Sequence, residues 1–526
     1  MPFRRIDAAS LALAAIVFIA VRYPLLAGDG MHQGFNSDSA IIGLMGRKLL
    51  EGRGFDFFFW GQSYLGPLTS WFAAAAGALI GHVGPLALRA GALVEVFLGI
   101  VFVWLGLWRL DARVANVVAI ALAIGPPVLY SFSLDPYGAE MAFTLGAALF
   151  AFGVRQLTTA EPSHASWLAF GVLAGFSWWM TQQVVFTLLA LGAVLAMPLL
   201  LAGFRIGRSR LLRGPLVVRV LQALGVAMLA VYFIGEASGW WMVPFVLSPT
   251  IDALLLIVVP ALFVRGEPLK LPRVRLPWIA LPGFALGYAP VWLGRLLDWY
   301  PRSYVFHFSL NYPSGVIEQG RQFFSRSGSM WMGANMLLVV VCVAVAARKW
   351  RTWSDAMKFT ALIPPANLAF YLLSYAKPHY LISSSAMLLA LAVLGALAMP
   401  LWLRAIAFTI GLVTMTLASL QVQQRLLGQP DPRPLLREVA ARQCTVVYAD
   451  FWVAYHQRFI EGERRAWVPY NSQDRTRDES LAARRLPGQR CLVRKDGRVE
   501  LLAADPPIRR GPPSASLRPG HPPAAR

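Results

Sequence analysis

Residues 36–68 read "NSDSAIIGLMGRKLLEGRGFDFFFWGQSYLGPL" and follow the first apolar segment of the chain. The stretch combines an acid, a cluster of aromatic residues and apolar positions at helical spacing, namely Ile42, Met45 and Leu49. This pattern predicts a helix that Ser37 or Asp38 caps and that ends at "EGRG". A short amphipathic helix of this kind is suited to lying flat on a membrane surface.

The composition around this stretch is that of a polytopic membrane protein. Of 526 residues, 57% are hydrophobic and 14% are charged, and the mean hydropathy is +0.54. These values exclude a soluble globular protein. The first hydrophobic run, 8–26, follows "MPFRR" and lacks a small-residue cleavage pattern. We therefore expect a retained anchor, with Arg4 and Arg5 holding the N-terminus in the cytoplasm.

The formal charge of +21 is distributed in short basic clusters between apolar runs. This distribution is typical of membrane topology, and no aromatic-interleaved basic groove indicates a nucleic-acid partner. Counting runs of about 20 apolar residues predicts an all-α module of about 13 transmembrane helices over residues 1–424. The basic clusters expected on the cytoplasmic side are 109–113, 155–166, 205–214, 265–275 and 348–358.

One apolar run is not expected to cross the membrane. Residues 68–84, "LTSWFAAAAGALIGHVG", are long enough to be counted as a span, but a crossing here would put the basic cluster 109–113 outside. We therefore expect a juxtamembrane helix, followed by the second span at 88–108. The first outer loop then covers residues 28–86.

A second domain is expected after the last span. Residues 425–505 contain four strand-like runs around a helical "FWVAYHQRFIEGE", which predicts a small C-terminal α/β domain; the runs are "CTVVYA", "RAWVPY", "RCLVRK" and "RVELLA". Cys444 and Cys491 each begin a strand, and an oxidising compartment would allow a disulfide between them, although spacing alone fixes no geometry. Residues 506–526 are rich in Pro and small residues and are expected to be disordered.

Three separated motifs resemble one enzyme superfamily. The pattern "D-S-A-x-x-G-L-M-x-R-x-L-L-E-G-R", followed by "F-F-x-W-G-Q-x-Y-L-G-P-L", resembles the first outer loop of the GT-C polyprenyl-phosphate-sugar-dependent glycosyltransferases. Within this superfamily the likeness is to the family of bacterial aminoarabinose transferases and protein O-mannosyltransferases. Residues 133–150 are similar to its second outer loop, and 374–392 to its basic-Tyr stretch before a late span.

The resemblance implies a reaction and the residues that carry it. A sugar on a polyprenyl phosphate or diphosphate would be displaced at its anomeric carbon with inversion, and Asp38 would act as the general base or orient the acceptor. The second acid is either Asp135 in "LDPYG" or Glu140 in "YGAE". Read without the family, Asp135 is a turn residue and Glu140 a first-turn helix acid. These three acids could also hold a divalent cation, which the family leaves open.

Donor-phosphate contacts are expected from basic and aromatic residues at the outer ends of late spans. They are Lys377, His379 and Tyr380 in "AKPHY" and Arg295 and Arg302 in the loop "RLLDWYPRSYVFHF". An anchoring belt at the membrane interface is the alternative. The motif favours the donor role for Lys377 and Tyr380, whereas a belt or loop role is favoured for Arg295, Arg302 and His307. Residues assigned to the sugar or acceptor are Gln62, Tyr64, Tyr137 and His307.

The chain departs from this family at the donor contacts. Aminoarabinose transferases carry an acidic-basic pair before the Pro of the first loop, whereas this chain has Tyr64, Leu65 and Gly66 there. The acid pair that often opens the helix is reduced to Asp38 and Ser39. These changes leave the identity of the donor sugar and any metal undetermined by the resemblance.

The sequence therefore predicts a membrane glycosyltransferase of the bacterial inner membrane. It would use a polyprenyl-linked donor and a lipid, glycan or protein acceptor on the outer face, with the C-terminal domain in the periplasm. A transporter or flippase of lipid-linked sugars is the alternative. Transporters usually show repeated halves and broken midplane helices, whereas the polar residues of this chain gather in asymmetric outer loops.

Overall fold

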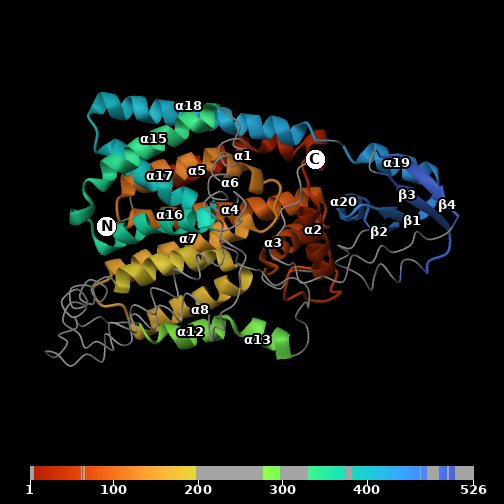
Figure 1. The fold of residues 1–526 in the computed structure, drawn as a ribbon, viewed down its shortest axis with the longest axis horizontal. Helices are drawn as coiled ribbons and strands as arrows, with labels where there is room; N and C mark the ends of the chain where they lie inside the picture. Colours follow the sequence, from red (N-terminus) through yellow and green to blue (C-terminus); the bar gives the residue numbers. More distant parts are fainter. Residues whose placement is uncertain are drawn as a thin grey trace, which may run out of the picture.

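The computed structural model contains a helical bundle with a small sheet-containing domain at one end (Figure 1). The structure describes residues 5–60, 62, 65–196, 277–296, 330–373, 382–429, 431–462, 464–470, 482, 485–494 and 497–503. Predicted spans within 197–276 and 297–329, and the Pro-rich tail 506–526, lie outside the described residues.

Three described helices are long and apolar enough to cross a membrane. They are α4 (Pro85–Trp108), α7 (Ala139–Thr158) and α18 (Leu401–Leu427). Together with the composition, they give a helical membrane protein. The count of about 13 spans includes segments outside the described residues and stays a prediction.

The other helices complete the bundle and its connections. On the N-terminal side these are α1 (Arg5–Ala20), α5 (Ala112–Ile124), α6 (Pro127–Phe132) and α8 (His164–Met180), with short 3-10 turns at Tyr23–Leu25, Gly28–His32 and Gln182–Val184. Later in the chain come α12 (Ala280–Gly287), α13 (Ala289–Leu296), α15 (Met330–Ala347), α16 (Asp355–Leu373) and α17 (Ile382–Leu397), with a 3-10 turn at Trp350–Thr352.

Helix α3 (Leu68–Ile80) corresponds to the apolar run that is not expected to cross. It has 13 residues, and at 1.5 Å per residue it is shorter than the roughly 20 residues that a span needs. It ends at Gly81, whose φ of 99° is a left-handed conformation that glycine adopts without strain. It packs closely on α4 at Gly91, where an added Cβ would lie 2.6 Å from the main-chain nitrogen of Ala73.

Helix α2 (Ser37–Leu50) differs from the sequence prediction in its cap and in its burial. Asn36, in an extended conformation, is the N-cap, and its side-chain oxygen accepts a hydrogen bond from the Ser39 nitrogen at 3.0 Å. The prediction of Ser37 or Asp38 as the cap is therefore wrong, because the helix begins one residue earlier. The helix does not present a free polar face, since Ser39 to Gly46 are all buried.

The C-terminal domain is built on a four-stranded sheet of order β2-β1-β3-β4. Strand β1 is parallel to β2 and β3, and β4 is antiparallel to β3. The elements are α19 (Arg433–Ala441), β1 (Cys444–Ala449), α20 (Phe451–Glu461), β2 (Ala466–Pro469), β3 (Gln489–Val493) and β4 (Val499–Leu502). β1 is apolar and largely buried, as expected for a central strand of a covered sheet.

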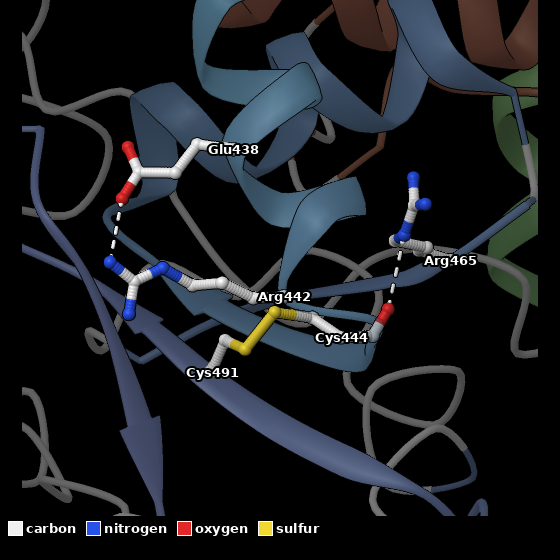
Figure 2. The surroundings of a disulfide bond; sticks show 5 residues. All are labelled: Glu438, Arg442, Cys444, Arg465 and Cys491. Atoms are coloured by element: carbon white, nitrogen blue, oxygen red, sulfur yellow. Dashed lines mark hydrogen bonds and ion pairs between the residues drawn. A yellow bond between two sulfur atoms is a disulfide. The ribbon is translucent and has the colours of Figure 1, made fainter.

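A disulfide joins two neighbouring strands of this sheet. Cys444 of β1 and Cys491 of β3 are bonded, with their Cα atoms 5.8 Å apart. Figure 2 shows the bond together with Arg465, whose guanidinium donates to the Cys444 carbonyl at 3.0 Å. The disulfide therefore closes the segment that contains α20 and β2.

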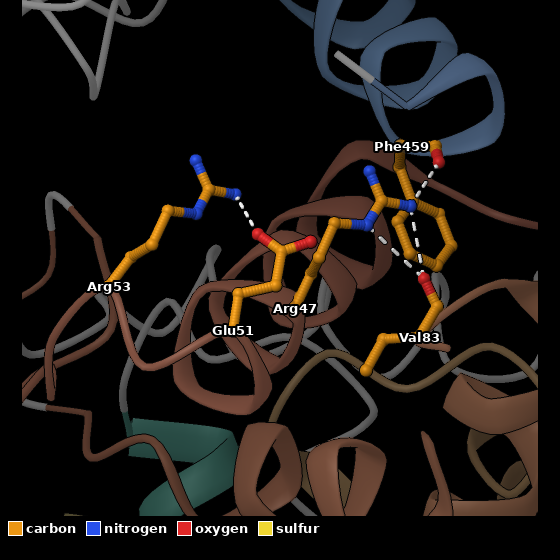
Figure 3. Close-up of polar contacts among 5 residues, drawn as sticks. All are labelled: Arg47, Glu51, Arg53, Val83 and Phe459. Atoms are coloured by element: carbon orange, nitrogen blue, oxygen red, sulfur yellow. Dashed lines mark hydrogen bonds and ion pairs between the residues drawn. The ribbon is translucent and has the colours of Figure 1, made fainter. Parts of the chain in front are cut away.

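The domain contacts the bundle through α20, which lies beside α2 (Figure 1). The ring of Phe459 sits where a side chain at Gly43 would be, and Phe35 contacts the same ring edge-on with centroids 6.2 Å apart. Arg47, in the last turn of α2, donates to the carbonyls of Phe459 at 2.9 Å and Val83 at 3.0 Å (Figure 3). Helix α2 is thus held between α3 and the C-terminal domain.

Candidate functional site

The starts of α2 and α7 meet at the end of the bundle that carries the C-terminal domain, and Asp135 joins them. Its carboxylate accepts from the Asn36 nitrogen at 3.1 Å and from the Asn36 amide group, which lies 3.0 Å from both oxygens. The Ser39 hydroxyl donates to the same carboxylate. Asp135 thus binds the cap of α2 and a residue of its first turn, and fixes the loop before α7 against the loop before α2.

In the sequence, Asp38 lies between Asn36 and Ser39, the two residues that hydrogen-bond to Asp135. It is the second residue of α2, where a carboxylate interacts favourably with the positive end of the helix dipole. The residue is half-buried, whereas Ser37 and Ser39 on either side are fully buried. The first turn therefore directs Asp38 toward the less enclosed side of the helix.

Tyr137 lies among the three candidate acids. Burial raises the pKa of its hydroxyl, and the charges of Asp135, Glu140 and Asp38 raise it further, while Arg425 opposes them. Its ring packs edge-on against Phe132 with centroids 4.5 Å apart. The hydroxyl is therefore neutral, and it can donate a hydrogen bond to a bound hydroxyl or phosphate oxygen.

Glu140 is fully buried at the start of α7. Its carboxylate accepts from the Gly138 nitrogen at 2.8 Å, the Tyr137 nitrogen at 3.1 Å and the Thr69 hydroxyl at 2.9 Å. These contacts satisfy main-chain donors at the helix start and tie it to α3. In this geometry Glu140 shapes the loop that carries Tyr137. Glu95 of α4, also fully buried, lies close enough to interact with its charge.

Two buried arginines that no sequence motif indicated, Arg89 and Arg22, support this arrangement. Arg89 of α4 donates to the Leu134 carbonyl at 3.1 Å and to carbonyls of the first outer loop. Arg22, just after α1, donates to the Ser133 hydroxyl at 2.7 Å and the Ala123 carbonyl at 2.7 Å. The sequence does contain a signal that could have identified them: each is a single arginine at the end of an apolar run. In a membrane protein such an arginine is usually buried and hydrogen-bonded.

The aromatic cluster of the first outer loop packs on α8. Trp179 donates its indole N–H to the Phe57 carbonyl at 2.9 Å, and its ring lies 6.0 Å from that of Trp71. The Gly66 nitrogen donates to the Met180 carbonyl at 2.8 Å. Gln62, assigned from the sequence to the sugar or acceptor, lies in the tight turn that these contacts hold.

A small cavity of about 10 Å³ lies beneath α2 and has room for one water molecule. Its lining is apolar except for Thr69 and Ser70, and it includes Ile42 and Met45 of α2. It is too small for a sugar, so the substrates are expected to bind elsewhere.

Apart from Gln62, which lies in the turn described above, the predicted site residues fall into two groups. The structure brings Asp38, Asp135, Tyr137 and Glu140 together. Six others and the side chain of Arg295 lie outside the described residues: Tyr64, Arg302, His307, Lys377, His379 and Tyr380. Within the described part of the chain, no group of three or more His, Cys, Asp or Glu residues is placed to hold a metal ion.

No protein-family model and no curated protein matches this chain. Solved structures that are similar include the Archaeoglobus fulgidus oligosaccharyltransferase in its apo form, at 14% identity and a TM-score of 0.48, covering 88% of this chain and 64% of that one. This chain therefore spans less than two thirds of that enzyme's length. The same archaeal enzyme with an inhibitory peptide and a dolichol-phosphate gives 13% identity, a TM-score of 0.47 and coverage of 96% and 75%.

A third similar structure is ArnT from Cupriavidus metallidurans bound to undecaprenyl phosphate. It shows 13% identity and a TM-score of 0.35 over 92% of both chains. These neighbours are GT-C superfamily glycosyltransferases, the superfamily that the sequence motifs resemble.

The titration of Asp135 gives a testable pH dependence of stability. Burial raises the pKa of Asp135 from 3.8 to about 6, although hydrogen bonds from Ser39 and Asn36 and the charge of Arg89 oppose the rise. The folded protein thus holds this proton more tightly than the unfolded chain. The contribution of Asp135 to stability is therefore largest below about pH 4, falls until about pH 6 and is constant above it.

Thermal unfolding in detergent between about pH 4 and 8 measures this effect. The melting temperature of the wild type, relative to Asp135→Asn, is expected to fall between about pH 4 and 6 and then to remain level. A relative melting temperature that rises over this interval would contradict the assignment.

Proposed function

We propose that this protein is a membrane glycosyltransferase that uses a polyprenyl-linked sugar donor. The observation that carries the proposal is the meeting of Asp135 and Tyr137 with the first turn of α2, which carries Asp38, in a protein with helices apolar and long enough to cross a membrane. This arrangement supports a reaction between a membrane-bound donor and an acceptor that approaches from water.

In the proposed step the Asp38 carboxylate takes a proton from an acceptor hydroxyl. The freed oxygen attacks the anomeric carbon of the sugar as the bond between that carbon and the phosphate oxygen breaks, and the configuration inverts. The phosphate leaves as an anion, for which basic or neutral hydrogen-bond donors such as Tyr137 are suitable partners. Asp135 and Glu140 hold the two loops that carry Asp38 and Tyr137.

The donor and acceptor are proposed from the sequence motifs. The donor is a polyprenyl phosphate or diphosphate carrying a hexose or pentose, and its phosphate would contact Lys377, His379 and Tyr380, with Arg295 and Arg302 nearby. The acceptor is a lipid, glycan or protein, with His307, Tyr64 and Gln62 as candidate contacts.

The location is proposed to be the bacterial inner membrane, with about 13 spans in residues 1–424 and the domain 425–505 in the periplasm. The disulfide between Cys444 and Cys491 supports an oxidising compartment for this domain. Because α20 of the same domain contacts α2, the proposed site is then also on the outer face.

Transfer by purified protein distinguishes this proposal from a transporter. In detergent there are no compartments, so an enzyme should still move labelled sugar from extracted polyprenyl-linked donors to an acceptor fraction, and a transporter should not. Mass spectrometry of glycolipids, surface polysaccharide and glycoproteins from cells with and without the gene then identifies the product. No transfer in detergent, together with an unchanged glycan profile, would reject the proposal.

A further inference from the structure

Arg89 is a fully buried cation whose partners are main-chain carbonyls. A guanidinium has five N–H donors, and the hydrogen bonds of Arg89 go to four different residues: Leu134 at 3.1 Å, Gly30 at 2.8 Å, Leu25 and Gln33. Its plane also lies over the ring of Phe35, 4.3 Å from the centroid.

These carbonyls belong to two different loops that end at the candidate acids. Leu25 ends the 3-10 turn after α1, and Gly30 and Gln33 lie at the beginning of the segment that continues through Phe35 into the cap of α2. Leu134 lies in the second outer loop, one residue before Asp135. The Arg89 side chain therefore joins the two loops just before Asn36 and Asp135, the residues that hydrogen-bond to each other.

The surroundings of Arg89 favour this role over simple packing. A buried charge is costly unless its donors are satisfied, and an apolar side chain would fill the same space at lower cost. The planar guanidinium reaches several carbonyls at fixed angles, which the point charge of a lysine does not. At Gly34, φ is +75° and an added Cβ would lie 3.5 Å from the Arg89 Nη2 atom, so the loop turns closely around the cation.

We propose that Arg89 is a positioning residue of the transfer reaction, which sets the place of Asp38 relative to Asp135 by fixing the first outer loop against the second. This inference rests on the proposed glycosyltransferase function. Arg89 itself does not need to touch the substrate.

Arg22 provides a matched comparison, because it is also a fully buried arginine close to the second outer loop. It donates to the Ser133 hydroxyl at 2.7 Å and to the carbonyls of Ala123 at 2.7 Å and Phe18 at 3.1 Å. Its partners thus include the second loop but none of the first-loop carbonyls that Arg89 holds.

The charge of Arg89 also gives a readout that packing alone would not change. Burial raises the pKa of Asp135, and Arg89 is the cation that opposes this rise. Asn36 and Ser39 face Asp135 from α2, and Tyr137, from the same loop, lies close to it. Around Tyr137 the further charged groups are Asp38, Glu140 and Arg425. Loss of the Arg89 charge is therefore expected to move the titration of Asp135 to higher pH.

The test compares Arg89→Met, Arg89→Lys and Arg22→Met in the full-length protein. For Arg89→Met we expect kcat to fall by about 100-fold, because a displacement of about 1 Å at a reacting group has this effect. The KM for the donor should change little, and the pH interval over which the Asp135 contribution to the melting temperature is lost should move to higher pH. Arg89→Lys should return this interval to its wild-type place without restoring kcat. Arg22→Met should lower the melting temperature and leave the interval unmoved.

Hydrogen exchange of residues 25–36 and 131–138 provides a readout without activity. Faster exchange in both segments is expected for both Arg89 variants, and only in the second segment for Arg22→Met. If Arg89→Met does not fold, Arg89→Lys alone decides. A folded Arg89 variant with wild-type hydrogen exchange and wild-type kcat would overturn the inference. If the protein is not a glycosyltransferase, the expected change in hydrogen exchange still holds and only the expected change in kcat is lost.

Discussion

Asp38→Asn is expected to give a folded, abundant protein whose transfer rate is about 10²- to 10⁴-fold lower, because a general base typically contributes this much. Asn has nearly the shape of Asp but cannot accept the proton of the acceptor hydroxyl. The substitution spares the helix start, since the cap bond to Ser39 comes from Asn36. Transfer of labelled sugar by purified protein, measured together with the melting temperature, checks both parts of this expectation.

Glu51→Gln is the matched control on the same helix. Glu51 lies at the other end of α2, where its half-exposed carboxylate pairs with Arg53 at 2.6 Å (Figure 3). Exposed pairs of this kind contribute little to stability, so activity should remain within about twofold of the wild type. Normal transfer by Asp38→Asn would remove Asp38 as the base. An equal loss in both variants would mean that activity follows the stability of α2.

The helix after Asn36 could be predicted from local pattern. The apolar spacing in this stretch predicted a helix, and the structure places that helix at Ser37–Leu50. Helical periodicity depends on residues three and four positions apart, so a single sequence contains the necessary information. That residues 68–84 do not cross the membrane stays a prediction.

The hydrogen bonds that Asn36 and Ser39 make to Asp135 could not be predicted from local pattern. Asn36 and Asp135 are 99 residues apart, and the role of Asn36 as cap depends on an extended backbone that the bond to Asp135 helps to hold. Likewise, Arg89 was not recognised because its partners are carbonyls, which carry no side-chain signature. The burial of α2 was also missed, since an amphipathic pattern does not reveal which later helix will cover the other face.

Removal of the disulfide is expected to loosen α2 as well as the C-terminal domain. The chain-entropy relation gives about 4 kcal/mol for closing a loop of this size, and the sequence separation of Cys444 and Cys491 is 47 residues. The closed segment contains α20, whose Phe459 ring packs on Gly43 of α2. In Cys444→Ser/Cys491→Ser, hydrogen exchange should therefore rise in residues 451–461 and also in 37–50, with a fall in transfer rate.

Phe459→Ala separates the stability of the domain from its contact with α2. It leaves the disulfide in place but removes the ring that contacts Gly43, Phe35 and the Arg47 guanidinium. Exchange should then rise in α2 while strand β1 remains protected. If α2 exchanges as in the wild type in both variants, the domain does not hold the helix that carries Asp38. If α2 loosens in both, the domain acts as a structural part of the site, because its α20 holds the helix that carries Asp38.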